Sequence, residues 1–269
     1  MSSISVNGID LHYELAGPEQ APVVVFSNSI GTTAEMWNQQ IPGLVDRYRC
    51  LRYDTRGHGR SEVVDRAITI DDLARDLAGL LDALGIAQAH VVGLSLGGMT
   101  AQALAVARPD LAKSVVLMAT AGHLPPAQAW AQRAATVRSN GMAAIVDAVI
   151  PRWFTPSFVQ GSPAEVARVR ERFVQMDPRG YAICCGVIEQ MDLRQRVSAI
   201  RAPTLIVAGA DDPATPVSMM DDLRQRIVDS ELVVLPRAAH LLAIERADLV
   251  NRHLGAFLDA IAGRDASQR

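Results

Sequence analysis

One serine in the chain stands in a pattern that suits a nucleophile. Ser95 is the centre of Gly93-Leu94-Ser95-Leu96-Gly97, a segment that follows an apolar run and precedes a helical pattern. A turn this tight between a strand and a helix gives the serine strained backbone angles, and the flanking glycines remove Cβ atoms that would clash. The hydroxyl would project at the carboxyl edge of a sheet, above a helix N-terminus that favours negative charge. The spacing therefore predicts nucleophilic catalysis by Ser95.

A serine hydroxyl needs a base that removes its proton, and the chain has six histidines that could supply one. In folds with this kind of serine turn the order along the chain is serine, acid, histidine, so the base is expected late in the sequence. His240 follows the last predicted strand, on a loop at the same sheet edge as Ser95. We therefore expect His240 to be the base, the alternative being a solvated loop histidine.

The acid is expected after the penultimate strand, 204–208, where Asp211 and Asp212 are adjacent. A carboxylate in this place accepts the Nδ1 proton of the histidine, fixes its tautomer and stabilises the imidazolium. Position relative to the strand leaves both aspartates as candidates.

The pattern of apolar runs predicts the scaffold that brings these residues together. Residues 4–6 and 11–15 alternate around Asn7-Gly8, as in a β-hairpin. Residues 23–26 are a continuous apolar run, typical of a strand buried on both faces of a parallel sheet. Similar segments follow at 49–54, 89–94, 114–119, 204–208 and 232–235. Helical patterns lie between them, at 70–84 after a capping box that begins at Thr69, and at 97–108, 217–227 and 249–261. The alternation predicts an α/β fold with a mostly parallel, eight-stranded sheet.

One long segment interrupts this alternation. From about 125 to 197 the pattern is helical throughout, and so long an insertion between two buried strands cannot belong to the sheet. We expect a helical cap over the end of the sheet where α/β folds bind ligands. The predicted organisation is a core of residues 1–122 and 198–263 and a cap of residues 123–197, with a frayed polar tail from Arg264 onward.

Composition limits the partners that the protein can have. The 269 residues are 49% hydrophobic and 20% charged, which provides a sizeable core and excludes disorder. A net charge of −3, no basic run and 4% aromatic residues argue against nucleic acid. No apolar stretch is long enough to span a membrane and the first residues do not resemble a secretory signal, which favours a soluble, cytoplasmic protein. No metal-ligand, disulfide or phosphate-loop spacing is found, so no metal or cofactor is expected.

The serine turn together with the acid loop Gly209-Ala210-Asp211-Asp212 resembles the α/β-hydrolase superfamily. The acid loop of that superfamily commonly reads Gly-x-x-Asp. The resemblance therefore implies that Asp212 is the acid and that Asp211 is a loop residue.

The same resemblance implies an oxyanion hole made by two backbone N–H groups. One belongs to Leu96, after the nucleophile, and the other to Ile30, in Ser27-Asn28-Ser29-Ile30-Gly31, where many members have His-Gly-x. The segment 53–61 also matches a superfamily loop that is structural in relatives, and we expect Asp54 and Arg56 to stabilise a turn there.

Four segments are similar to one branch of the superfamily, the 3-oxoadipate enol-lactonases. They are 27–31, Arg152-Trp153-Phe154-Thr155-Pro156, 180–185 with 191–194, and 212–216, and the similarity extends from about Asn7 to Phe257. The resemblance implies a cofactor-free serine hydrolase that converts 3-oxoadipate enol-lactone and water to 3-oxoadipate, in the β-ketoadipate pathway of aromatic degradation. Departures at 118–123 and at Ala238-Ala239 leave another lactonase, or a carboxylesterase or perhydrolase-type enzyme with a neutral substrate, as alternatives. A non-catalytic ligand-binding protein is a further alternative, because binding proteins on this fold can keep an intact triad.

A lactone with a free carboxylate requires a cation in a dry pocket. Trp130 and Arg133 are three residues apart on a predicted cap helix and share a face, as in the family's Trp-x-x-Arg pattern. We expect Arg133 to bind the carboxylate, the alternatives being a solvated Arg133 and a cation supplied by Arg152. Trp153 is a candidate for the substrate wall or for the core of the cap.

Overall fold

The structure, a computed structural model, describes residues 2–267, and its centre is one eight-stranded sheet in the order β1-β2-β4-β3-β5-β6-β7-β8. β1 and β2 form the predicted antiparallel hairpin, β2 pairs antiparallel with β4, and all other pairs are parallel. The α/β-hydrolase fold predicted from the sequence is confirmed. The strands are β1 (Ser2–Val6), β2 (Ile9–Ala16), β3 (Val23–Ser27), β4 (Arg49–Tyr53), β5 (Ala89–Leu94), β6 (Ala112–Met118), β7 (Thr204–Gly209) and β8 (Ser230–Leu235).

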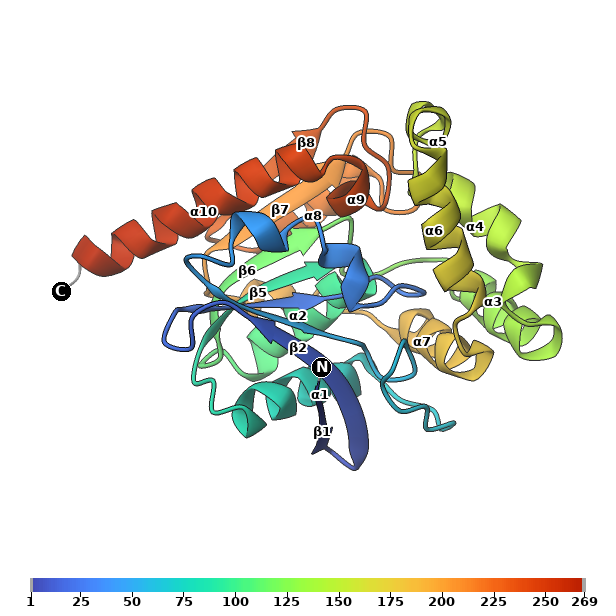
Figure 1. Cartoon of the computed structure of the whole chain (residues 1–269), viewed down its shortest axis with the longest axis horizontal. Helices are drawn as coiled ribbons and strands as arrows, with labels where there is room; N and C mark the ends of the chain where they lie inside the picture. The colour runs from blue at the N-terminus through green and yellow to red at the C-terminus, as the bar shows by residue number, and fades with distance from the viewer. Residues whose placement is uncertain (1, 268–269) are drawn as a thin grey trace.

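Helices cover both faces of this sheet: α1 and α2 lie on one face and α10 on the other (Figure 1). β3, β5 and β7 are buried along their whole length, which is why their sequences are continuous apolar runs. The capping box predicted at Thr69 is present, with the Thr69 N–H donating to Asp72 Oδ2 at 2.7 Å. The helices of the core are α1 (Ile70–Ala83), α2 (Leu96–Ala107), α8 (Val217–Arg226), α9 (Leu242–Glu245) and α10 (Ala247–Ser267).

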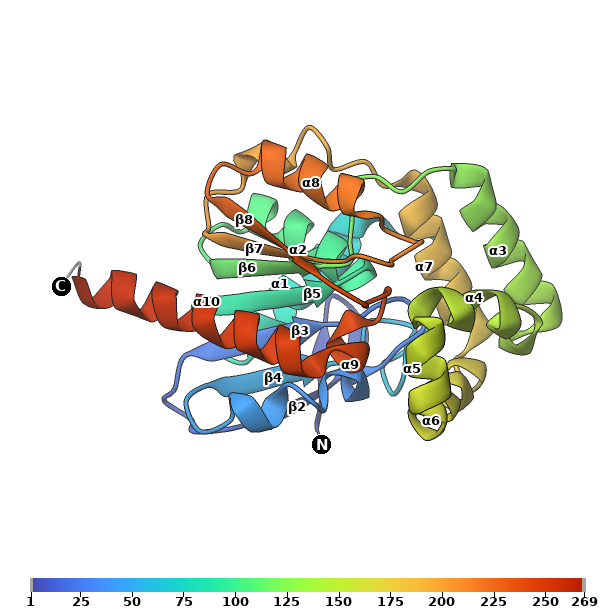
Figure 2. The ribbon, with the colours of Figure 1, turned by 90° about the horizontal axis from the view of Figure 1, so that it is seen from above.

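The segment between β6 and β7 is helical, as its pattern predicts, and its helices lie together beyond one end of the strands (Figure 2). The base of the segment is closed where His123 and Asp192 form an antiparallel bridge and the Leu193 N–H donates to the Gly122 carbonyl at 2.7 Å. The division into core and cap at residues 123 and 197 stays a prediction. The helices are α3 (Ala127–Asn140), α4 (Val146–Trp153), α5 (Pro156–Gly161), α6 (Pro163–Val174) and α7 (Pro178–Gln190).

Two predictions for the C-terminal part of the chain are wrong. The run 232–235 is not buried on both faces, and Val234 is 42% exposed, because β8 is an edge strand with β7 as its only neighbour. The tail predicted to fray from Arg264 is helical through Ser267, and the Arg264 guanidinium contacts Asp229 Oδ2 at 3.0 Å. The last two residues of that predicted tail lie outside the described residues.

Asp54 and Arg56 both stabilise the loop after β4, as expected, and each does so through its own partners. Arg56 forms a bidentate ion pair with Asp76 of α1, with both N–O distances 2.6 Å and both side chains buried. Asp54 instead accepts the backbone N–H groups of Ala34 and Arg60 at 2.8 and 2.9 Å. The two side chains therefore connect the loop after β4 to α1 and to the backbone at Ala34, and Asp54 also binds the loop's own backbone at Arg60.

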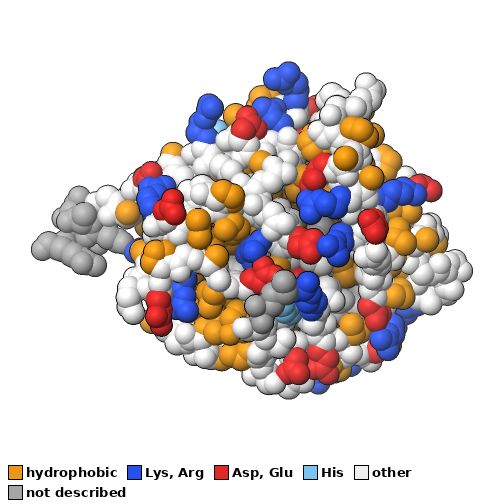
Figure 3. Space-filling view, viewed as in Figure 1, with side chains coloured by type: hydrophobic (Ala, Val, Ile, Leu, Met, Phe, Trp, Pro, Cys, Tyr) orange, Lys and Arg blue, Asp and Glu red, His pale blue; other side chains and the backbone are white. Residues whose placement is uncertain are grey.

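The surface gives no sign of a nucleic-acid site on the face shown in Figure 3, where acidic and basic side chains are interspersed. Within residues 2–267, none of the helices has the length and apolar character needed to cross a bilayer. The same described residues contain no cluster of three or more His, Cys, Asp or Glu side chains arranged to hold a metal ion.

Candidate active site

Ser95 occupies a strained turn between β5 and α2. Its φ of +56° and ψ of −117° lie outside the regions that most L-residues adopt. A Cβ at Gly93 would lie 2.2 Å from the Gly97 carbonyl oxygen, and one at Gly97 would lie 2.0 Å from the Ser27 carbonyl oxygen. Both positions therefore exclude any side chain, as the motif predicts. The backbone of Ser95 is anchored by its N–H to the Met118 carbonyl, at 2.9 Å.

His240 and Asp212 form a buried hydrogen bond at the carboxyl end of the sheet. The Nδ1 of His240 lies 2.8 Å from Asp212 Oδ2, and their side chains are 5% and 0% exposed. Because an ionised carboxylate can only accept, Nδ1 carries the proton and Nε2 is left as the basic nitrogen. Asp211 is exposed, and its backbone N–H donates to the Ala238 carbonyl at 2.9 Å. The geometry thus brings Asp212, and not Asp211, to the imidazole.

Asp212 remains ionised in this buried place because several donors surround it. Burial by itself raises the pKa of the carboxyl, but His240 and the hydrogen bonds from Thr215 outweigh burial, and the pKa lies below its ordinary value. The Thr215 hydroxyl donates to Oδ2 at 2.6 Å, and the N–H groups of Ala214 and Thr215 donate to Oδ1 at 2.7 and 3.1 Å. Sequence reasoning did not identify Thr215, although it lies in the segment 212–216 that resembles the enol-lactonases.

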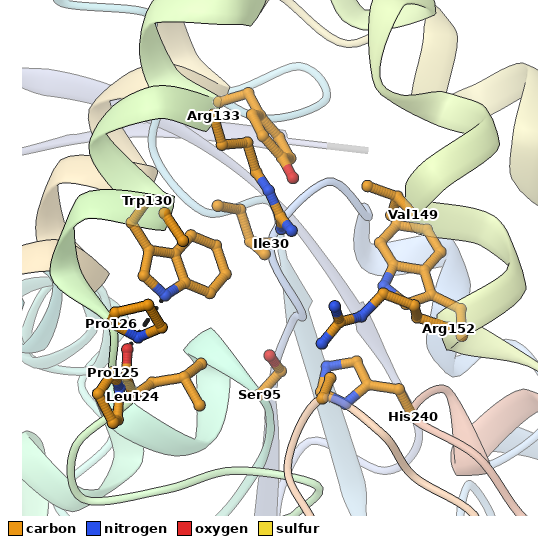
Figure 4. A pocket seen from close by; sticks show the side chains of 14 residues that line it. Ile30, Ser95, Leu124, Pro125, Pro126, Trp130, Arg133, Val149, Arg152 and His240 are labelled. Atoms are coloured by element: carbon orange, nitrogen blue, oxygen red, sulfur yellow. Dashed lines mark hydrogen bonds between the residues drawn. The ribbon is translucent and has the colours of Figure 1, made fainter.

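Ser95 and His240 open into one cavity of about 150 Å³. Their side chains lie beside each other on its floor, below Ile30 and the side chains of the helical segment (Figure 4). The structure records no hydrogen bond between Ser95 Oγ and His240, a looseness that is common in hydrolases without substrate. Access of the hydroxyl to the cavity allows it to reach a bound carbonyl group.

The loop after β3 carries Ile30, the predicted oxyanion donor, to the edge of this cavity. Among residues 2–267 no acceptor is found for the N–H of Ile30 or of Leu96, so both remain available to a ligand. The loop is held by buried contacts: Asn28 Nδ2 donates to the Tyr53 carbonyl at 2.7 Å, and the Gly31 N–H donates to His58 Nε2 at 2.9 Å. His58 is a second residue that sequence reasoning did not single out, although it lies in the matched segment 53–61.

Trp130, Arg133 and Trp153, the predicted substrate-binding residues, all line the cavity, and their role in binding stays a prediction. The Arg133 guanidinium lies over the Trp130 ring, with Cζ 4.6 Å from the ring centroid, and it points into the cavity in Figure 4. Trp153 is buried and packs edge-on against Phe173 at 5.2 Å, so it belongs both to the core of the helical segment and to the cavity wall.

A buried glutamate joins the helical segment to the loop of His240. Glu245 Oε1 accepts the Thr155 N–H at 3.0 Å, and Oε2 accepts the Ala239 N–H at 2.8 Å. Beside it, the Leu241 N–H donates to the Trp153 carbonyl at 2.9 Å. The position of His240 is therefore coupled to the start of α5. The sequence gives no local signal for the contact of Glu245 with Thr155, because these two residues are 90 positions apart in the chain.

The comparison with known proteins agrees with this fold. Residues 24–253 match the model of the alpha/beta hydrolase family, and the chain belongs to that family. Within it, the chain is 38% identical to 3-oxoadipate enol-lactonase 2 of Acinetobacter baylyi, over 95% of this chain and 96% of the relative. The crystal structure of the enol-lactonase from Burkholderia xenovorans superposes with a TM-score of 0.94 at 40% identity, covering 96% of this chain and 100% of that one. A putative carbamate hydrolase RutD of Variovorax paradoxus is 31% identical over 94% of this chain and 97% of its own length.

The buried His58 predicts a dependence of stability on pH. Burial lowers its pKa from the ordinary 6.5 to about 4, which keeps Nε2 free to accept the Gly31 N–H. The unfolded chain therefore binds a proton below pH 6.5 while the folded chain does not. The neutral, buried His58 therefore makes its full contribution to the free energy of unfolding above pH 6.5 and loses it as the pH falls toward 4. At pH 4.5 the free energy of unfolding is lower by about 2–3 kcal/mol for this reason.

We expect His58→Gln to be less stable than the wild type at pH 7.5 but to lose less stability between pH 7.5 and pH 4.5. Urea unfolding of both proteins at the two pH values measures the difference. An equal loss in the two proteins would show that His58 does not titrate as its burial requires.

Proposed function

We propose that the protein is a cofactor-free serine hydrolase that opens a carboxylated lactone, 3-oxoadipate enol-lactone, to give 3-oxoadipate. The observation that carries the proposal is the buried His240–Asp212 hydrogen bond at 2.8 Å, beside Ser95 in a cavity that also contains arginine side chains. The residues 123–197 would act as the cap that encloses the substrate.

The reaction begins with attack by Ser95. His240 Nε2 accepts the Ser95 hydroxyl proton as Oγ bonds to the ring carbonyl carbon, and Asp212 stabilises the imidazolium that forms. The negative oxygen of the tetrahedral intermediate accepts hydrogen bonds from the Ile30 and Leu96 N–H groups. The ring C–O bond then breaks, and the leaving enolate oxygen takes the proton from His240. The ring is then open, and the enol, still joined to Ser95 through the acyl group, becomes a ketone.

Water completes the cycle on the same residues. His240 accepts a proton from a water molecule as the water oxygen bonds to the acyl carbon, and the second tetrahedral intermediate uses the same two N–H groups. When the bond to Ser95 Oγ breaks, His240 returns the proton to the serine. The product leaves as a dicarboxylate, so no metal or redox group enters any step of the proposed reaction.

The charge of the cavity supports an anionic substrate. Arg133 and Arg152 both line it, and neither forms an ion pair with a carboxylate of the described residues. Arg152 Nη2 donates to the Pro213 carbonyl at 3.3 Å, and its guanidinium lies on the His240 side of the cavity (Figure 4). Arg133 is the farther of the two from His240 and more buried, which favours it as the anchor for a carboxylate remote from the reacting carbonyl.

A second candidate is hydrolysis of a neutral ester or a carbamate. It is favoured by the 31% identity to a relative named as a putative carbamate hydrolase, and by an esterase of Thermogutta terrifontis that superposes with a TM-score of 0.90 at 28% identity. The enol-lactonase relatives are more similar to this chain, and a neutral substrate would offer no carboxylate to the two arginines that line the cavity.

If the triad operates as proposed, Ser95→Ala and His240→Ala should each lower kcat about as much as the double substitution does, on the order of 10⁶-fold. Asp212→Asn should lower kcat far more than Asp211→Asn, because only Asp212 contacts the imidazole. Lactone hydrolysis by the purified variants measures these effects. Near-normal turnover by His240→Ala would exclude His240 as the base, and a larger loss at Asp211 would move the acid by one residue.

Arg133→Ala should lower kcat/KM on a carboxylated lactone by roughly 10- to 150-fold, the equivalent of about 1.5–3 kcal/mol for a charge-assisted hydrogen bond. Arg133→Lys should recover part of the loss, because an ammonium lacks the planar fork of a guanidinium. Hydrolysis of p-nitrophenyl acetate, which is neutral, should change little.

Arg138→Ala is the matched control for Arg133, since Arg138 lies on the same helix and pairs with Asp65 at 2.8 Å outside the cavity. It should leave both activities unchanged. Equal losses on the two substrates in Arg133→Ala would show that Arg133 supports the helical segment rather than the ligand. No loss on either substrate would move the search for the anchor to Arg152.

A further inference from the structure

The cavity contains a buried hydroxyl group whose proton has no acceptor among residues 2–267. Tyr181, on α7, is 0% exposed and lines the cavity. The Arg133 guanidinium, which can only donate, lies near its hydroxyl oxygen, and the hydroxyl proton has no acceptor among the other described residues. An unpaired polar group of this kind costs about 1–3 kcal/mol, so buried hydroxyls in folded proteins almost always have a partner. Its position on the cavity wall suggests a partner that arrives with the ligand.

The ring of Tyr181 is fixed, which fixes the place of the hydroxyl. It packs edge-on against Phe173, with the ring centroids 5.5 Å apart and the planes at 83°. On another edge, a Cβ at Gly31 would lie 3.0 Å from Tyr181 Cε2, so the loop that carries Ile30 touches the ring directly. A ring held from these sides has little freedom to turn its hydroxyl toward another acceptor.

The hydroxyl is a donor at neutral pH and lies in the field of a cation. Burial raises the pKa of Tyr181 above its ordinary value, and the nearby Arg133 guanidinium opposes this only in part. The phenol therefore keeps its proton. Arg133 comes from α3, which packs against α7, so a hydroxyl donor and a guanidinium donor meet at one part of the cavity.

We propose that Tyr181 is a specificity-determining residue, whose hydroxyl donates a hydrogen bond to the same substrate carboxylate that Arg133 binds. This inference rests on the proposed function, because it names the group that recognises the charged part of that substrate. A carboxylate has two oxygens and accepts several hydrogen bonds, so it can satisfy the guanidinium and the phenol together. A neutral ester would leave the buried hydroxyl unpaired, and the site would discriminate against it for that reason.

Tyr181→Phe tests this role because it removes the hydroxyl and keeps the ring. We expect kcat/KM on a carboxylated lactone to fall by roughly 10-fold or more, mainly through KM, with little change on p-nitrophenyl acetate. The Tm should stay the same or rise, since the substitution removes an unpaired buried group. In the double variant with Arg133→Ala, the combined loss should be smaller than the product of the two single losses, because both groups act on one carboxylate.

Tyr48→Phe is the matched control, since Tyr48 is also buried but packs against His90 away from the cavity. It should leave the ratio of the two activities unchanged. Equal losses on both substrates in Tyr181→Phe, or no loss on either, would overturn the proposal. The second outcome is expected if a bound water molecule, rather than the substrate, is the partner of the hydroxyl.

A binding measurement separates this inference from the proposed reaction, because it needs no turnover. Titration calorimetry of the wild type with adipate, a simple dicarboxylate, should show binding that weakens roughly 10-fold in Tyr181→Phe and also weakens in Arg133→Ala. Adipamide, which is uncharged, should bind more weakly and without dependence on Tyr181. Adipate binding with this dependence but without lactone hydrolysis would reject the reaction and keep the carboxylate site. No adipate binding, or equal binding by wild type and Tyr181→Phe, would reject the site.

Discussion

The turn between β5 and α2 sets the position of Ser95 relative to the other residues of the site. It holds Ser95 at a positive φ, and this is possible because the backbones at Gly93 and Gly97 approach other main-chain atoms more closely than any side chain would allow. The contact at Gly97 is made with the carbonyl of Ser27, at the end of β3. The serine turn and the loop that carries Ile30 are therefore in direct backbone contact. Close packing in this one place fixes the hydroxyl relative to both proposed oxyanion donors.

The second constraint is the connection between His240 and the helices above it. Asp212, itself held by Thr215, orients the imidazole through its Nδ1. Glu245 and the Trp153 carbonyl connect the loop of His240 to the residues just before α5. A change in the position of α5 would therefore be transmitted to the base. In this arrangement the helices that would recognise the substrate also help to set the geometry of the reacting groups, which couples binding to chemistry.

The sequence predicts those parts of the molecule that local pattern determines. Alternation of apolar runs and helical segments predicts the sheet, and the glycines around Ser95 together with the order of serine and histidine predict two members of the site. The choice of Asp212 over Asp211 needed the family's loop pattern, since neighbouring residues have the same local context. An apolar run does not show where its strand lies in the sheet. The sequence therefore predicted a buried strand at 232–235, where β8 is an edge strand with an exposed side chain. The contacts of Arg56 with Asp76 and of Glu245 with Thr155 were missed because they join segments distant in the chain. The missing acceptor of the Tyr181 hydroxyl likewise becomes visible only in the folded molecule.

The central claim is that Ser95 is a nucleophile activated by the base beside it. Covalent labelling with a fluorophosphonate, followed by intact-mass and peptide mass spectrometry, tests it without assuming any substrate. We expect one phosphonyl group per chain, located on the peptide that contains Ser95, with labelling slowed strongly by His240→Ala because the hydroxyl then keeps its proton. Stoichiometric labelling of a different residue, or labelling of Ser95 at an unchanged rate without His240, would contradict the account.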